Sequence, residues 1–275
     1  MGTLLIVSNI LRSDMFRSRI GAAWLSVISN SLVILLELGA GLLTGSISII
    51  AGAINSMVDL IAAGIAVVSL RIADKPADTE HPYGHGKVEN VAGTLQAALI
   101  FVAAAFIVYE AVRKVKEGAR VESLELGIGI MAISVAVNFF VSRHILRVAR
   151  ETDSLALEAD ARHLIADILT SLGVLLGLGA VRLTGWVLLD PIIALGVAFL
   201  ILRTGYQLIK RSAVGLVDIR LPAEEEGIIR SSLQEHYGEL LGFHDLRTRK
   251  AGRERHIDLH LVVAKGASVE KAHQL

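Results

Sequence analysis

The sequence predicts an all-α bundle of six transmembrane helices followed by a smaller C-terminal domain of mixed α and β structure. Hydrophobic residues make up 53% of the 275 residues and charged residues only 20%, which is too apolar for a typical soluble domain. The mean hydropathy is +0.59, and apolar stretches of membrane-crossing length recur along the chain. This pattern fades near residue 211, where a more polar segment begins.

Six stretches are long enough to cross a bilayer, which takes about 20 apolar residues in a helix. They are Ile20–Leu43, Ile47–Ile72, Val88–Val112, Leu126–Leu146, Leu155–Val181 and Leu188–Leu208. We assign residues 1–211 to the transmembrane domain and residues 212–275 to the C-terminal domain. No cleaved signal peptide is expected, because the apolar N-terminal run precedes Arg12, Arg17 and Arg19 instead of following positive charges.

The C-terminal domain begins with a helix pattern and continues with two strand patterns. Pro222 and the acidic residues after it are typical of a helix start, and we expect a helix of about 17 residues there. Phe243–Arg249 and His256–Val263 indicate strands, with Gly252 in the turn between them. A further helix begins near Ser268. Because these elements form only part of an α+β domain, we expect the domain to be incomplete at its C-terminal end.

Lys and Arg are distributed unevenly between the two sides of the predicted bundle. An even number of spans places both termini on one side, and a side rich in positive charge is typically cytoplasmic. The basic residues on that side are Arg12, Arg17, Arg19, Arg71, Lys75, Lys87, Arg143, Arg147, Arg150, Arg203, Lys210 and Arg211. The other side has Arg113, Lys114, Lys116, Arg120 and Arg182. We therefore expect cytoplasmic termini and a location in the plasma (inner) membrane.

Two pairs of polar residues interrupt the apolar spans. Asn55 and Asp59 are four residues apart in the second span, and His163 and Asp167 have the same spacing in the fifth. Residues at this spacing share one helix face, and an ionisable residue inside a membrane needs a partner. Two carboxylates, one imidazole and one amide oxygen form a ligand set suited to a divalent cation. The alternative is a structural contact in which these side chains only bond to each other across the bundle.

Composition excludes several other kinds of site. The chain has no cysteine and a formal net charge of zero at pH 7. Disulfides and thiolate metal sites are therefore excluded, which leaves nitrogen and oxygen as metal ligands. A neutral chain also lacks the basic surface typical of nucleic-acid binding. An intramembrane metalloenzyme is disfavoured because the sequence has no His-Glu-x-x-His motif.

Two further groups of metal-capable residues lie outside the spans. Asp78, His81 and His85 follow the second span, in a loop that Pro82 and Gly84 can turn back on itself. A solvated loop that binds nothing is the alternative for this group. The second group lies in the C-terminal domain and consists of His244, His256, Asp258, His260 and His273. Positions 256, 258 and 260 share one strand face, although strand histidines are often surface residues without a ligand.

These motifs resemble those of the cation diffusion facilitator family of divalent-metal transporters. The loop sequence His81-Pro-Tyr-Gly-His85-Gly-Lys87 is highly specific for that family, and the pairs in the second and fifth spans fall where its transport site lies. The resemblance covers nearly the whole chain. It implies a cytosolic C-terminal domain with a ferredoxin-like fold, through which two copies form a homodimer.

The resemblance also assigns roles to residues outside the spans. It implies a loop metal site at Asp78, His81 and His85, and a cytosolic dinuclear site that includes His244, His260 and His273. It further implies a charge lock between Lys87 and Asp218 near the membrane surface. Many zinc-exporting members have Asp or His at the position of Asn55, whose amide can bind metal through oxygen but cannot exchange a proton.

We therefore expect a secondary active transporter, not an enzyme, that exports a divalent cation in exchange for protons by alternating access. Zinc is the first candidate, with iron, cobalt, cadmium and manganese as alternatives, because Asn55 should weaken zinc selectivity while His163 disfavours a purely manganese site. The competing interpretation is a non-transporting, metal-regulated scaffold or heteromer partner. The expected partners are a second copy of the chain, the bilayer, divalent cations and protons. Metal serves as substrate and ligand, with no organic cofactor and no nucleic acid.

Overall fold

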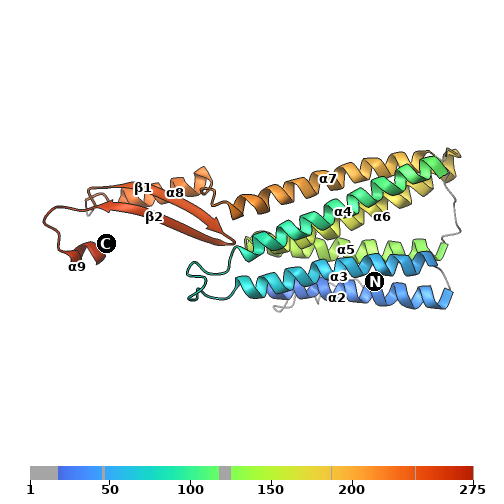
Figure 1. Ribbon diagram of the computed structural model, residues 1–275, viewed down its shortest axis with the longest axis horizontal. Helices are drawn as coiled ribbons and strands as arrows, with labels where there is room; N and C mark the ends of the chain where they lie inside the picture. The colour runs from blue at the N-terminus through green and yellow to red at the C-terminus, as the bar shows by residue number, and fades with distance from the viewer. Residues whose placement is uncertain (1–17, 45–46, 118–124, 187, 239, 275) are drawn as a thin grey trace.

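The structure is a computed structural model that describes residues 18–44, 47–117, 125–186, 188–238 and 240–274. Long helices form an elongated bundle, and the C-terminal domain extends from one end of it (Figure 1). The helices are α2 (Arg19–Thr44), α3 (Ile47–Ala73), α4 (Val88–Glu117), α5 (Glu125–Glu151), α6 (Leu155–Thr184) and α7 (Leu189–Leu216). Within the described residues these six helices are long and apolar enough to cross a membrane, which confirms the predicted class of the bundle.

Several helices continue beyond the apolar stretches that identify them in the sequence. α4 extends to Glu117 and ends in a turn that contains Lys114 and Lys116, where positive charge is favourable. α7 extends to Leu216, past residue 211, where the apolar pattern fades. Hydropathy identifies only the apolar part of a helix. The backbone hydrogen bonds of the helix can continue into more polar residues beyond that part.

Both ends of α6 are fixed by residues suited to capping. The Ser154 side chain accepts a hydrogen bond from the Leu157 backbone N–H at the first turn. At the other end Gly185 has φ 69°, and its N–H donates to the Val181 carbonyl oxygen at 2.8 Å. The short connection before Ser154 therefore passes directly into a helix that runs the length of the bundle.

Helix α6 contributes to both apolar clusters of the bundle. The first cluster joins it to α2, α3, α4 and α5 and includes Ala22, Ala66, Leu70, Ile145 and Leu164. The second joins it to α4 and α7 and includes Ala97, Ile100, Ala159, Ala166 and Leu208. The many alanines allow helix backbones to approach closely, as small residues do in membrane bundles. The side chains on the packed faces of α6 therefore lie near the centre of the bundle.

A buried polar network joins helices at the end of the bundle that adjoins the C-terminal domain. Arg19 of α2 is ion-paired with Glu89 of α4, whose Oε1 lies 2.5 Å from Arg19 NH1. Arg19 also pairs with Asp74, which follows α3. The Ser154 hydroxyl before α6 donates to Glu89 Oε2 at 2.5 Å. Because Arg19 is 7% exposed and Glu89 1%, the Glu89 charge depends on Arg19 for compensation, whereas Arg19 is compensated by Glu89 and Asp74 together.

The C-terminal domain has the predicted order of a helix, two strands and a short helix. It consists of α8 (Ala223–Glu235), β1 (Gly242–Ala251), β2 (Glu254–Val262) and α9 (Val269–Gln274). The strands are antiparallel, and Gly252 supplies a φ of 61° in the turn between them. α8 has 13 residues and is shorter than expected, because the chain leaves the helix before Gly238, where φ is 131°.

The hairpin contains an irregularity on β1. His244 pairs with His260 and Arg247 pairs with Asp258, so the register shifts between positions 244 and 247. Asp245 lies in this interval with φ 54°, a conformation that Asp tolerates better than most residues. The shift has the character of a β-bulge, which redirects nearby side chains.

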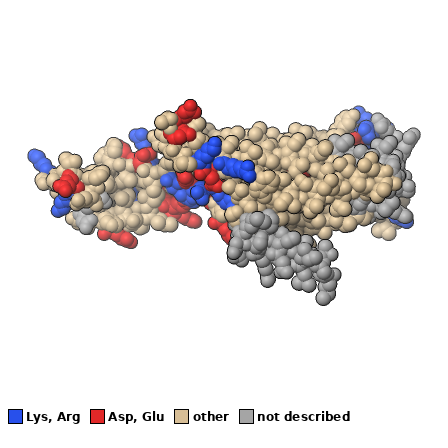
Figure 2. Space-filling view, turned by 90° about the horizontal axis from the view of Figure 1, so that it is seen from below, with Lys and Arg blue, Asp and Glu red and all other residues tan. Residues whose placement is uncertain are grey.

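Charged side chains gather where the C-terminal domain meets the bundle, whereas most of the bundle surface visible in the same view is uncharged (Figure 2). Asp153, in the connection between α5 and α6, pairs with Lys250 at 2.7 Å and with Arg255 at 2.9 Å. Arg255 also pairs with Glu225 of α8 at 2.9 Å. The tip of the hairpin is thereby attached both to the bundle and to its own domain.

Candidate metal centre

Three metal-capable side chains meet between α3 and α6, inside the bundle. His163 Nε2 lies 3.1 Å from Asp59 Oδ1. One ligand atom from each of Asp59, His163 and Asp167 lies within 4.8 Å of the others. Asp59 is 8% exposed and His163 is 3% exposed. Asp59 and His163 are buried and Asp167 is partly buried, and the three form a central cluster with one imidazole and two carboxyl groups.

Helix geometry explains why these residues converge. His163 and Asp167 are one turn apart on α6, on the side of that helix that packs against α3. Asn55 is one turn before Asp59 on α3, but its side chain lies outside the described part of the chain. Of the four residues in the two predicted pairs, the three whose side chains are described, Asp59, His163 and Asp167, therefore lie together.

The central cluster leaves polar atoms without hydrogen bonds. Within the described part of the chain, His163 Nδ1 and Asp167 Oδ2 are buried and have no hydrogen-bond partner, and the Asp167 oxygen is free to bind a cation. A purely structural contact would be expected to satisfy these groups, because an unsatisfied buried polar atom costs about 1–3 kcal/mol. Two carboxylates and a neutral imidazole can instead hold a divalent cation.

Asp160 is a buried residue beside this cluster that the spacing of the two polar pairs did not single out. It lies three residues before His163 on α6 and is only 1% exposed. The Ser26 side chain of α2 is a neighbour of the Asp160 carboxyl group. The i, i+3 spacing from His163 was a signal for it, since such residues are neighbours on a helix.

The loop between α3 and α4 brings together Asp78, His81 and His85. His81 Nδ1 lies 3.2 Å from Asp78 Oδ1, and His85 Nε2 lies 3.4 Å from Asp78 Oδ2. The turn is closed by a hydrogen bond of 2.9 Å from the Gly84 N–H to the His81 carbonyl oxygen, with Gly84 at φ 76°. Only Gly adopts such a conformation freely, so Gly84 lets the chain fold back and place both imidazoles near one carboxylate.

Backbone hydrogen bonding keeps Asp78 ionised. The His81 N–H donates to Asp78 Oδ1 at 2.6 Å and the Glu80 N–H donates to the same oxygen at 3.0 Å. The hydrogen bond from the His81 backbone is the largest cause that lowers the pKa of Asp78 below its ordinary value. His81 and Asp78 side chains are about half exposed, at 52% and 51%. Asp78 and His81 are therefore open to solvent, in contrast to the central cluster, whereas the His85 side chain is only 8% exposed.

The same loop is held against the hairpin tip. Arg249 stacks over the Tyr83 ring at 4.5 Å from its centroid, and His256 meets the edge of that ring at 5.7 Å between centroids. A side chain at Gly86 would collide with the Ala251 carbonyl oxygen, so glycine is needed at that point of close approach. These contacts connect the segment between His81 and His85 to the C-terminal domain.

Lys87 and Asp218 form an ion pair at the junction. Lys87 Nζ lies 2.8 Å from Asp218 Oδ1, and Arg249 NH1 lies 3.2 Å from the same oxygen. Hydrogen bonding to Lys87, followed by hydrogen bonding to Arg249, lowers the pKa of Asp218. Asp218 adopts φ 52° just after α7, which turns its carboxylate toward both cations.

The C-terminal domain has its own exposed cluster. Asp245 Oδ2 lies 3.3 Å from His244 Nδ1 and 3.4 Å from His260 Nδ1. The cross-strand pairing explains the approach of the histidines, and the bulge at Asp245 adds a carboxylate that strand alternation alone did not indicate. His273, on α9, belongs to none of the ligand clusters found in the described residues, and the same holds for His256 and Asp258.

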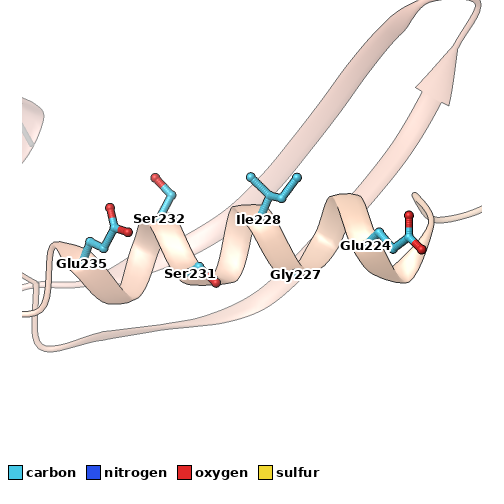
Figure 3. Close-up of a pocket in the computed structure, with 6 residues that line it drawn as sticks. All are labelled: Glu224, Gly227, Ile228, Ser231, Ser232 and Glu235. Carbon is cyan, nitrogen blue, oxygen red and sulfur yellow. The ribbon is translucent and has the colours of Figure 1, made fainter.

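One surface depression lies away from all three clusters. It follows the exposed face of α8 and is lined by Glu224, Gly227, Ile228, Ser231, Ser232 and Glu235 (Figure 3). Its side chains are spread along the helix instead of converging on one point, as the labelled sticks show. It therefore offers no metal centre, and the buried central cluster remains the strongest candidate.

The sequence matches two family models. The model described as the cation efflux transmembrane domain covers residues 23–217, and the model described as the cation efflux protein cytoplasmic domain covers residues 221–275. An uncharacterized transporter of Synechocystis is 38% identical over 240 residues, which is 87% of this chain and 77% of the relative. The cation-efflux pump FieF of Salmonella newport is 30% identical over 253 residues, covering 92% of this chain and 83% of the relative.

A further relative, protein p34 of Rickettsia rickettsii, is 28% identical over 254 residues, again 92% of this chain and 83% of the relative. The matches extend over the helix bundle and the C-terminal domain alike, so they account for both parts of the fold. This chain is a multi-pass membrane protein that belongs to the cation efflux transporters of the cation diffusion facilitator family.

Proposed function

We propose that this protein exports a divalent metal cation in exchange for protons, and that the ion binds at Asp59, His163 and Asp167, with Asn55 as a fourth ligand. The observation that carries the proposal is the buried meeting of two carboxylates and an imidazole between α3 and α6. A membrane interior tolerates such groups when they serve an ion or proton pathway. The cation efflux family of the chain supports the same activity.

Competition between the metal and protons for the same ligand atoms couples metal export to proton import. Metal binding requires deprotonated ligands, so an arriving cation displaces protons and arriving protons displace the cation. Alternating access exposes the same ligands first to one side of the membrane and then to the other. Asn55 cannot carry an exchangeable proton, so the exchanged protons come from His163, Asp59 and Asp167.

Zinc is the metal that this ligand set favours first. A tetrahedral set with an imidazole nitrogen and carboxylate oxygens suits Zn²⁺. The amide oxygen of Asn55 binds more weakly than a carboxylate and admits iron, cobalt or cadmium as well. Manganese prefers oxygen ligands throughout, so His163 disfavours it.

The remaining clusters fit supporting roles in this activity. Asp78, His81 and His85 form a loop site, and His244, Asp245 and His260 form a site in the cytosolic domain, from which His273 is separate within one chain. The Lys87–Asp218 pair acts as a charge lock between the two domains. The single chain exposes large apolar side chains on its C-terminal domain, such as Ile228 at 71% and Val269 at 87%, which favours a homodimer. Positive charge near the helix ends favours cytoplasmic termini and the inner membrane.

Transport in proteoliposomes tests the proposal. Purified protein is reconstituted with a zinc-sensitive dye or a pH-sensitive dye inside the vesicles, and zinc is added outside. Wild-type protein should move zinc inward and protons outward, whereas Asp59→Asn and Asp167→Asn should abolish both fluxes. Asp190→Asn is the matched control. Asp190 is a buried carboxylate outside the central cluster, and it pairs with Lys114 at the end of the bundle away from the C-terminal domain. Retained zinc and proton flux in both variants would refute the site.

A non-transporting scaffold with the same fold is the second candidate. It would bind metal and form dimers yet show no flux in the same vesicles. The buried central cluster argues against it, because a scaffold could use the exposed clusters alone. Zinc flux by the wild-type protein, absent from empty vesicles, would exclude this candidate.

A further inference from the structure

The two ring nitrogens of His163 have different surroundings. Nε2 faces Asp59 Oδ1 at 3.1 Å and therefore points to the cation position. Nδ1 is buried and, within the described chain, has no hydrogen-bond partner. A neutral imidazole carries one hydrogen, and if Nε2 is to bind a cation that hydrogen must be on Nδ1. A buried N–H of this kind needs an acceptor.

Asp160 offers hydrogen-bond acceptors that are themselves unpaired in the described structure. Both of its carboxylate oxygens are buried and lack a hydrogen-bond partner among the residues that the structure describes. The residue is 1% exposed and lies one helical turn before His163, where side chains are neighbours. The Ser26 hydroxyl is close enough to engage one of these oxygens, and the other remains an acceptor one helical turn from the unpaired His163 Nδ1.

The other charged groups nearby are already engaged. Arg162 Nε and NH2 donate to Glu158 Oε1 at 2.9 and 2.8 Å, and Arg211 of α7 contacts the same oxygen at 2.6 Å. Arg162 is therefore directed to Glu158 and does not neutralise Asp160. Asp160 is also outside the group of ligand atoms formed by Asp59, His163 and Asp167, so it is not a further ligand of the same ion.

We propose that Asp160 is a positioning residue that accepts the Nδ1 hydrogen of His163, directly or through one water, and so holds Nε2 toward the cation. This inference rests on the proposed transport site. Metal-binding histidines generally donate their second ring N–H to a carboxylate, a carbonyl or water, and loss of that partner lowers metal affinity about 10- to 100-fold. Asp160 thereby fixes both the tautomer and the orientation of the only imidazole in the central cluster.

Comparison of two metals tests this role. Binding of Zn²⁺ and of Mn²⁺ is measured by calorimetry in protein that carries alanine at His81, His85, His244 and His260, so that the exposed clusters do not contribute. Zn²⁺ uses imidazole nitrogen readily, whereas Mn²⁺ prefers oxygen ligands. Asp160→Ala should weaken Zn²⁺ binding about 10- to 100-fold and Mn²⁺ binding much less. Equal weakening of both metals, or no weakening of Zn²⁺, would overturn the inference.

Two further variants separate positioning from packing and from charge. Asp160→Asn keeps an acceptor oxygen and should restore the wild-type ratio of Zn²⁺ to Mn²⁺ affinity. Asp160→Leu fills the space but has no acceptor, so it should lower the ratio of Zn²⁺ to Mn²⁺ affinity as Asp160→Ala does. If Asn and Leu behave alike, the inference fails. Asp190→Ala serves as the control for loss of a buried carboxylate and should leave the ratio unchanged.

Failure of this inference can be distinguished from failure of the proposed function. If the background protein with Asp160 intact binds no Zn²⁺, the transport site itself is refuted. If that protein binds Zn²⁺ and Asp160→Ala changes both metals equally, only the positioning role is refuted. In the His163→Asn background there is no imidazole to orient, so Asp160→Ala should have little further effect on Cd²⁺ binding. An undiminished further effect would also overturn the inference.

Discussion

Lys87, which immediately precedes α4, is bonded to Asp218, which lies two residues after the end of α7. The pair at 2.8 Å thus joins the loop that carries His85 to the segment that leads into the C-terminal domain. Arg249 of β1 reaches the same carboxylate. Asp218 is therefore the shared anchor of two cations from two parts of the chain, and its removal should have a larger effect than removal of either cation.

The first prediction concerns this anchor. Asp218→Ala should increase hydrogen exchange in the hairpin tip more than Lys87→Ala does, because Lys87→Ala leaves the Arg249 contact in place. Exposed ion pairs contribute about 0–1 kcal/mol each, so the free energy of unfolding of the whole protein should change little. Hydrogen exchange followed by mass spectrometry gives the local effect, with Lys271→Ala on α9 as a control. Equal exchange in all variants would contradict the anchor role.

The second prediction is the pH dependence of the junction. Hydrogen bonds from Lys87 and Arg249 hold the pKa of Asp218 below its ordinary value of 3.8. A lowered pKa means that the stabilisation is fully present above pH 3.8 and is lost as the pH falls through the lower folded value. Wild-type hairpin exchange, corrected for the intrinsic rate, should therefore rise only in strongly acidic solution. Asp218→Asn should lack this transition, and a transition that persists in Asp218→Asn would assign it to another group.

The third prediction concerns the loop cluster. In protein with Asp59→Asn and Asp167→Asn, His85→Ala should remove one bound Co²⁺ per chain, because the loop offers only one cluster of ligands among its described residues. The visible absorption of bound Co²⁺ reports the loss. Tyr83→Phe, which keeps the aromatic ring that Arg249 covers, should retain the ion. An unchanged Co²⁺ count in His85→Ala would remove the loop from the metal-binding sites.

The fourth prediction compares two candidate ligands in the C-terminal domain. Asp245 lies against His244 and His260 in one chain, whereas His273 does not belong to that cluster. Asp245→Ala should therefore weaken Zn²⁺ binding to this domain more than His273→Ala. Calorimetry at several protein concentrations makes the comparison. A dominant effect of His273→Ala that grows with dimerisation would show that a second copy brings this histidine to the site.

The fifth prediction concerns the buried network at the domain-proximal end of the bundle. Glu89→Gln removes the more deeply buried of the two carboxylates that pair with Arg19 and leaves Asp74 in place, so it should destabilise the protein by about 3 kcal/mol, the lower end of the range for a broken buried ion pair. Ser154→Ala removes only one hydroxyl and should cost about 1–2 kcal/mol. Thermal unfolding in detergent checks the order of the two effects. If Ser154→Ala were the more damaging change, the charge pair would not be the main stabilising contact.

The helix bundle and the central cluster were accessible from sequence because each rests on short-range rules. Span length follows from bilayer thickness, and four-residue spacing places His163 and Asp167 on one face of α6. The approach of Asp59 to His163 followed from the cost of leaving a carboxylate alone in an apolar span. Local geometry and burial thus determine most of this site.

The features that sequence did not indicate depend on contacts between distant segments. Asp245 joins the C-terminal cluster only because of a bulge with positive φ, which strand alternation does not reveal. The contact of Tyr83 with Arg249 and His256 requires the relative position of two domains. Asp160 had a local signal, but its importance appears only once burial and the unpaired Nδ1 of His163 are known.

The close approach of Gly86 to the hairpin turn has a consequence for how the protein is made. The Ala251 carbonyl fills the space that a side chain at Gly86 would need, yet Ala251 is synthesised long after the helices that flank this loop. Domains generally fold as units during synthesis, the N-terminal one first. The loop with His81 and His85 therefore meets its docking surface only after the hairpin turn has left the ribosome.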